Sequence, residues 1–150
     1  MSLREGTAQE GTGVGSKSFA AAVVDLSGVH VLLVEDDEDS RQLLATFLEY
    51  CGALVTMCHT TESALEDLAE YRPHVIISDL ALPGADGLQF IRALRRLEPE
   101  AGGDVPAIAV SAYDKDFTAV EAKVAGYTGY LVKPVNLDDL VTLVRDVVSP

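Results

Sequence analysis

A sequence of 150 residues is long enough for one domain with its own core, and its 48% apolar content excludes a disordered chain. Acidic residues outnumber lysine and arginine by 24 to 11, and the resulting net charge of -13 disfavours binding to nucleic acid or to an anionic membrane surface. No apolar run approaches the roughly 18–20 residues of a membrane span. Cys51 and Cys58 are too few for a disulfide scaffold and fit a reducing compartment, so we expect a cytoplasmic protein.

The first 28 residues differ in composition from the rest and predict a flexible tail or linker. Glycine recurs through this segment, and almost no large apolar residue precedes Phe19. Residues 11–18, GTGVGSKS, superficially resemble a phosphate-binding loop. However, Ser16 stands where that loop needs a glycine before Lys17, and no predicted strand precedes it. We therefore expect no nucleotide site here, and we place a single domain at residues 29–149.

Five short runs of apolar or β-branched residues predict five strands. They lie at residues 29–34, 53–58, 74–78, 107–111 and 129–132. The apolar residues in these runs are continuous rather than alternating, which is typical of strands buried on both faces of a parallel sheet.

The segments between these runs have the apolar spacing of helices. Residues 86–89 and 136–139 each begin with a capping residue, and Phe117, Val120 and Val124 predict the buried face of the fourth helix. Strict alternation of strand and helix predicts an α/β fold. Right-handed crossovers favour a flavodoxin-like, doubly wound, five-stranded parallel sheet of order 2-1-3-4-5 with helices on both faces.

Polar residues follow four of the five predicted strands. Parallel strands end at one edge of a sheet, where ligands bind, so these residues are expected to converge: Glu35, Asp36, Asp79, Ser111 and Lys133. Three carboxylates brought together need a cation, and oxygen ligands suit Mg²⁺. A metal ion, an ammonium group and a hydroxyl around one exposed carboxylate are the equipment for phosphoryl transfer to that carboxylate.

Each feature also has a simpler interpretation. The acidic run can be a solvated helix start, and we accept this for residues 37–39. An aspartate after a strand can cap a helix, and the Lys133–Pro134 pair can be an ordinary turn. Four such features at strand ends, in order along the chain, favour a common site.

Four segments together resemble a known family. They are residues 31–37 (VLLVEDD), 76–87 (IISDLALPGADG), 110–112 (VSA) and 129–134 (GYLVKP). In this order they resemble the receiver domain of two-component response regulators, and the resemblance covers residues 29–149. It implies a signalling module that accepts a phosphoryl group with Mg²⁺ and then presents a changed protein-binding surface; such a module is not classed as an enzyme.

The resemblance implies a role at each matching position. Asp79 matches the phospho-acceptor, Asp36 a direct Mg²⁺ ligand and Glu35 a ligand acting through a metal-bound water. Ala81 lies where the family offers a backbone carbonyl to the metal. The switch hydroxyl, the switch aromatic residue and the site lysine correspond to Ser111, Tyr130 and Lys133. Glutamate at position 35 and serine at position 111 depart from the commoner aspartate and threonine but keep the functional groups.

The resemblance also implies partners and a site geometry. The phosphoryl donor would be a histidine kinase or a phosphotransfer protein, and the downstream protein target would bind the fourth helix, fifth strand and fifth helix. The Lys133–Pro134 bond is expected to be cis, because the chain must turn sharply while Lys133 points back to Asp79. Ala81 and Tyr113 match positions that control water access, and both are expected to prolong the life of the phosphoryl group.

Three other interpretations remain open at this point. The chain could be the receiver of a hybrid histidine kinase, or a pseudo-receiver that only binds proteins. A phosphatase of the haloacid-dehalogenase type would need a second aspartate two residues after the nucleophile. That position is Ala81, which argues against a phosphatase.

Overall fold

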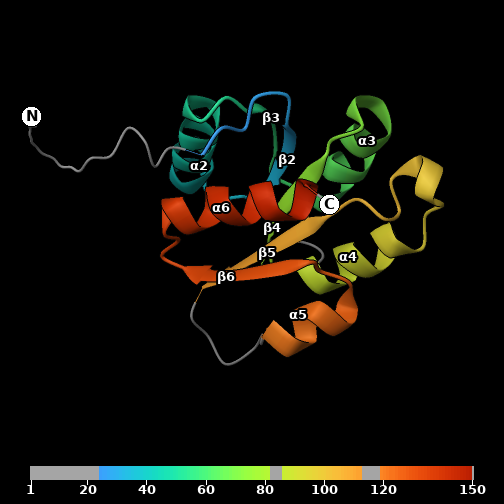
Figure 1. Ribbon diagram of the computed structural model, residues 1–150. Helices are drawn as coiled ribbons and strands as arrows, with labels where there is room; N and C mark the ends of the chain where they lie inside the picture. Colours follow the sequence, from blue (N-terminus) through green and yellow to red (C-terminus); the bar gives the residue numbers. More distant parts are fainter. Residues whose placement is uncertain (1–23, 82–85, 113–118, 150) are drawn as a thin grey trace, which may run out of the picture.

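A computed structural model describes residues 24–81, 86–112 and 119–149, which form one five-stranded parallel sheet with helices on both faces (Figure 1). The strand order is β3-β2-β4-β5-β6, which is 2-1-3-4-5 in chain order and confirms the predicted topology. The strands are β2 (His30–Val34), β3 (Leu54–Cys58), β4 (Val75–Asp79), β5 (Ala107–Ala112) and β6 (Gly129–Lys133).

The strand register brings the carboxyl ends of the strands to one edge. Val34 lies beside Ser78, Asp79 beside Val110, and Ser111 beside Val132. The predicted runs begin and end within one residue of the observed strands. The central strands β2 and β4 are almost fully buried, as their continuous apolar runs predicted. The edge strand β3 is half open to solvent, with Leu54 65% exposed, because it has a neighbour on one side only.

Two helical layers cover the sheet (Figure 1). The α-helices are α2 (Glu38–Tyr50), α3 (Thr61–Tyr71), α4 (Gly87–Arg95), α5 (Ala119–Ala125) and α6 (Leu137–Val148). A core cluster that includes Leu48 and Leu140 joins α2 and α6 to one face of the sheet. A second cluster, which includes Leu68, Ile91 and Ala122, joins α3, α4 and α5 to the other face. The predicted caps are confirmed, since Asp86 accepts from Gln89 N and Asn136 from Asp139 N.

The prediction for the buried face of the fourth helix was wrong. Val120 and Val124 of α5 are 71% and 82% exposed, whereas Ala122 is fully buried. A short helix that packs closely against its neighbours does so through a small side chain, and the two valines then point outward. The third residue of the predicted face, Phe117, lies outside the described residues.

The described part of the chain begins with residues that already touch the domain. Leu26 is fully buried, and its N–H donates to the Cys51 carbonyl at 2.8 Å. The predicted division into a tail at residues 1–28 and a domain at 29–149 stays a prediction. Among the described helices, none combines the length and the apolar character that crossing a membrane would require.

Candidate functional site

The polar residues predicted to converge do lie at the carboxyl ends of four strands. Glu35 follows β2, Asp79 ends β4, Ser111 lies near the end of β5, and Lys133 ends β6. Three of them are almost inaccessible to solvent: Glu35 is 2% exposed, Asp79 6% and Ser111 3%. Burying carboxylates without compensation is costly, so these groups need partners at close range.

Lys133 is the partner of two buried carboxylates. Its Nζ lies 2.9 Å from Glu35 Oε1 and 2.9 Å from Asp79 Oδ2. Burial lowers the pKa of Lys133, but hydrogen bonds to Asp79 and Glu35 outweigh it and leave the pKa above its ordinary value. The ammonium group therefore stays charged at neutral pH. For Glu35, burial raises the pKa, and the hydrogen bond from Lys133 opposes that shift without cancelling it.

Backbone N–H groups bind the oxygens of Asp79 and Glu35 that Lys133 does not contact. Asp79 Oδ1 accepts from Ala81 N at 3.0 Å, so both oxygens of Asp79 are engaged. Glu35 Oε2 accepts from Asp37 N at 3.1 Å. The side chain of Asp37 accepts from Ser40 N as the cap of α2, which agrees with the helix-start interpretation of residues 37–39. The carboxylates that converge at the strand ends are thus Glu35, Asp36 and Asp79, whereas Asp37 caps α2 and Glu38 and Asp39 lie in its first turn.

Three carboxylates form the group best suited to hold a metal ion. Oxygen atoms of Glu35, Asp36 and Asp79 lie within 4.8 Å of one another, and Asp36 is exposed whereas the other two are buried. An all-oxygen set of this kind, open to solvent on one side, fits a hard cation such as Mg²⁺. The donor chemistry therefore agrees with the predicted cofactor.

The other predicted residues, Ser111 and Tyr130, lie on strands β5 and β6. The Ser111 hydroxyl donates to the Ala112 carbonyl at 3.1 Å. Tyr130 is half-buried and packs against the core cluster that includes Ile91. The Lys133–Pro134 peptide bond is cis, as predicted. Tyr113, the second residue expected to control water access, lies outside the described residues.

An apolar groove of about 440 Å³ opens beside Lys133, and sequence reasoning missed it. Its walls come from α2 and from the segment after β6, and they include Leu43, Pro134 and Val135. Leu43 is 59% exposed although it is apolar. The signal that could have found this groove is a surplus apolar residue in the α2 sequence, because Leu43 directly precedes Leu44, which is buried in the core.

Sequence reasoning also missed two residues that support the site. The Arg41 side chain donates from Nη1 to the Glu35 carbonyl at 2.8 Å and holds the backbone after β2 in place. Tyr127, in the loop between α5 and β6, reaches the first residue of α4, where its hydroxyl donates to the Gly87 carbonyl at 2.8 Å. Nothing in the spacing of either residue marks these contacts.

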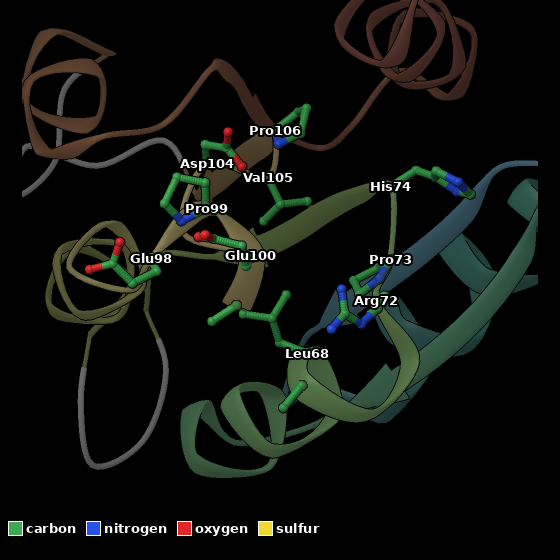
Figure 2. A pocket seen from close by; sticks show the side chains of 13 residues that line it. Leu68, Arg72, Pro73, His74, Glu98, Pro99, Glu100, Asp104, Val105 and Pro106 are labelled. Atoms are coloured by element: carbon green, nitrogen blue, oxygen red, sulfur yellow. The ribbon is translucent and has the colours of Figure 1, made fainter.

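A second and larger cavity lies at the opposite end of the sheet. It measures about 660 Å³ and is bounded by the end of α3 and by the loop before β5 (Figure 2). Arg72 and His74 lie on one side of it and Glu98 on the other (Figure 2). Arg72, His74 and Glu98 are all exposed, so no buried ion pair among them marks this cavity.

Comparison with known protein families shows to which family this chain belongs. Residues 31–145 match the family model of the response regulator receiver domain. This chain belongs to that family. The chain is 37% identical over 116 residues to the KDP operon transcriptional regulatory protein KdpE of Escherichia coli, and 33% identical over 117 residues to the response regulator MprA of Mycobacterium tuberculosis. These matches cover 77% and 78% of the chain but 49% of each relative, so the receiver domain spans about half their length.

Solved structures agree with the family and the fold. The chemotaxis protein CheY4 of Vibrio cholerae is 29% identical, with a TM-score of 0.72, and the match covers 79% of this chain and 98% of that one. The receiver domain of the Francisella response regulator 1452 is 27% identical, with a TM-score of 0.72, and the match covers 81% and 97%. The relatives named here are response regulators and give no support to the hybrid-kinase alternative. Membership in the receiver family likewise argues against a haloacid-dehalogenase phosphatase.

Proposed function

We propose that this receiver domain accepts a phosphoryl group on Asp79 from a phosphohistidine of a histidine kinase or a phosphotransfer protein, with Mg²⁺ as cofactor. One observation carries the proposal: Lys133 Nζ lies 2.9 Å from both the Asp79 and the Glu35 carboxylates, in a cluster completed by Asp36. Membership in the receiver family supports it, since a receiver domain implies a histidine kinase as partner.

The transfer itself needs few groups. An oxygen of Asp79 attacks phosphorus and forms an O–P bond, while the N–P bond to the donor imidazole breaks. The imidazole nitrogen keeps the electron pair of that bond, and the product on the receiver is an acyl phosphate. Asp36, Asp79 and the Ala81 carbonyl would hold Mg²⁺ directly, with Glu35 acting through a water. The bound ion would neutralise charge on the phosphoryl oxygens.

Lys133 and Ser111 would respond to the new group. Before transfer, the Lys133 ammonium group pairs with two buried carboxylates. After transfer, the phosphoryl oxygens would compete for the same ammonium, and the Ser111 hydroxyl would turn from the Ala112 carbonyl to donate to them. Tyr130 would follow the hydroxyl as the switch aromatic residue. Loss of the phosphoryl group by hydrolysis would restore the first state.

Two surfaces fit the two kinds of protein partner. The apolar groove beside Lys133 lies next to the acceptor, which suits contact with the donor protein. The surface formed by α5, β6 and α6 carries exposed Val120, Val124 and Val132, which suits the unknown downstream target. The proposed location is cytoplasmic, since both cysteines are free and buried.

Labelling with a small phosphoramidate tests the proposal. The chain is incubated with phosphoramidate with and without Mg²⁺, and the added mass is located by mass spectrometry of peptides. Stoichiometric, Mg²⁺-dependent label on Asp79 is the expected result. An unlabelled chain would be a pseudo-receiver, and turnover of a generic phosphate monoester would revive the phosphatase alternative; either outcome overturns the proposal.

A further inference from the structure

Tyr127 is a buried tyrosine with a polar contact far along the chain. It follows α5 and precedes β6, and its side chain is 4% exposed within the core cluster that includes Ile91. Its hydroxyl donates to the Gly87 carbonyl at 2.8 Å, across 40 residues of sequence. Burial raises the pKa of Tyr127, and a hydrogen bond with Ser78 only partly opposes this, so the phenol keeps its proton at neutral pH. It therefore remains a hydrogen-bond donor.

The acceptor of this hydrogen bond lies directly against the backbone at Asp79. Gly87 N donates to the Leu80 carbonyl at 2.7 Å. A Cβ atom on Gly87 would lie 2.7 Å from Leu80 Cα and 2.9 Å from the Asp79 carbonyl oxygen, so the two segments touch with no room between them. Ser78, on the other side of Asp79, lies beside the Tyr127 phenol, and its hydroxyl group can donate its one hydrogen either to the phenol oxygen or to the Asp79 carbonyl oxygen 3.2 Å away. The phenol thus contacts the chain before and after Asp79.

The other end of this connection is helix α5. Gly126, the neighbour of Tyr127, accepts from Arg95 Nε at 3.0 Å. Arg95 is the last residue of α4 and Gly87 is the first, so residues 126 and 127 are held to both ends of α4. They lie immediately after α5, the helix with exposed Val120 and Val124. A shift of the backbone at Leu80 would therefore displace Tyr127 and, through Tyr127, the end of α5.

We infer that Tyr127 is a positioning residue whose hydroxyl ties the backbone following Asp79 to helix α5. The tie is a property of the fold, whereas its response to phosphorylation rests on the proposed function. Coupling between two sites is reciprocal, so a partner that binds α5 also biases the backbone at the acceptor aspartate.

The tie is tested first in the unphosphorylated chain by amide hydrogen exchange. We compare wild type, Tyr127→Phe and the matched control Tyr50→Phe, whose side chain is 71% exposed. The exchange rate of the Gly87 amide is divided by the exchange rates of the Leu32 and Ile108 amides, which belong to fully buried strand residues. This ratio removes the effect of a change in global stability. We expect this ratio to rise roughly two- to tenfold in Tyr127→Phe, as for loss of one neutral hydrogen bond, and to stay unchanged in Tyr50→Phe. An unchanged ratio in Tyr127→Phe overturns the tie.

The response to phosphorylation is tested separately by amide chemical shifts. Wild type and Tyr127→Phe are saturated with phosphoramidate and Mg²⁺, and shifts are compared at α5 and at Lys133. We expect Lys133 to respond in both proteins but α5 to respond less in Tyr127→Phe at equal label. An equal α5 response in both would overturn the coupling. If wild type takes no label, the proposed function has failed, while the exchange ratio still decides the tie.

Discussion

The two ends of the parallel sheet differ in whether their charged side chains are buried. At the carboxyl end, Glu35 and Asp79 are buried and held by Lys133 at 2.9 Å, and the adjoining groove measures only about 440 Å³. At the opposite end, a cavity of about 660 Å³ is lined by charged residues such as Glu98 and Glu100 that all face solvent (Figure 2). Charged groups in water gain little from one another, whereas buried ones must be matched. Convergent burial of paired charges therefore marks the candidate site better than cavity volume does.

Removing the central cation should produce the largest effect. Lys133→Met leaves the buried Glu35 and Asp79 carboxylates without their ammonium partner. Breaking a fully buried pair costs roughly 3–5 kcal/mol, and since Lys133 is itself 26% exposed we expect a loss of about 2 kcal/mol in the free energy of unfolding. Urea unfolding measures this loss, and phosphoramidate labelling should fall with it.

The control for that substitution is Lys123→Met, which removes an exposed lysine from α5. Its effect should stay within about 0.5 kcal/mol. Equal losses in the two variants would show that Lys133 does not stabilise a buried charge cluster.

A pair of glycine substitutions separates the two ends of the sheet. A Cβ on Gly87 would meet the backbone of Asp79 and Leu80, and a Cβ on Gly103 would collide with the Leu97 carbonyl oxygen. Both Gly87→Ala and Gly103→Ala should destabilise the fold by about 1–3 kcal/mol, because backbone must move.

Only the substitution near the site should also affect phosphorylation. We expect the labelling rate per folded molecule to fall in Gly87→Ala and to remain at the wild-type value in Gly103→Ala. Thermal unfolding and phosphoramidate labelling of the same samples provide both numbers. A similar fall in both variants would mean that the two ends are not functionally distinct.

The lifetime of the phosphoryl group should respond to the side chain two residues after Asp79, the proposed acceptor. Ala81 has no polar side-chain atom that could hold an attacking water. Ala81→Asn should therefore speed the loss of phosphate by up to about tenfold, which corresponds to about 1.4 kcal/mol in the barrier. Decay of the acyl phosphate after removal of the donor, at fixed Mg²⁺, measures the rate. No acceleration would contradict this account of water control.

The smallest expected effect lies at the end of the sheet away from the site. His30 N donates to His74 Nδ1 at 2.9 Å, and His30 Nε2 contacts Thr56 Oγ1 at 2.7 Å. Burial and the nearby His74 lower the pKa of His30, with a hydrogen bond involving the Tyr71 backbone opposing them. The unfolded chain then binds the proton more readily than the folded one, so stability should decline as pH falls below about 6.5.

Urea unfolding at several pH values checks the sign of this effect. The decline should be smaller in His30→Gln and unchanged in His59→Gln, which replaces an exposed histidine. The same pH dependence in wild type and His30→Gln would show that His30 is not its source.

Much of this fold could be predicted because its signals are local. Buried strands produce continuous apolar runs, and Asp86 and Asn136 cap helices through residues three positions later. The convergence of Glu35, Asp79, Ser111 and Lys133 followed from the rule that parallel strands end at one edge. The α5 face was mispredicted because the orientation of a short helix depends on which neighbours it packs against. The Tyr127–Gly87 contact spans 40 residues, and no periodic pattern records it.

The most direct test of the central claim replaces the proposed acceptor Asp79 and a matched aspartate at the other end of the sheet. Asp79→Asn keeps the shape of the side chain but removes the nucleophilic carboxylate, whereas Asp104→Asn changes an exposed residue of the larger cavity. Both variants and the wild type are incubated with phosphoramidate and Mg²⁺, and their intact masses are measured. We expect wild type and Asp104→Asn to gain one phosphoryl group each and folded Asp79→Asn to gain none. Stoichiometric phosphorylation of Asp79→Asn would contradict the account.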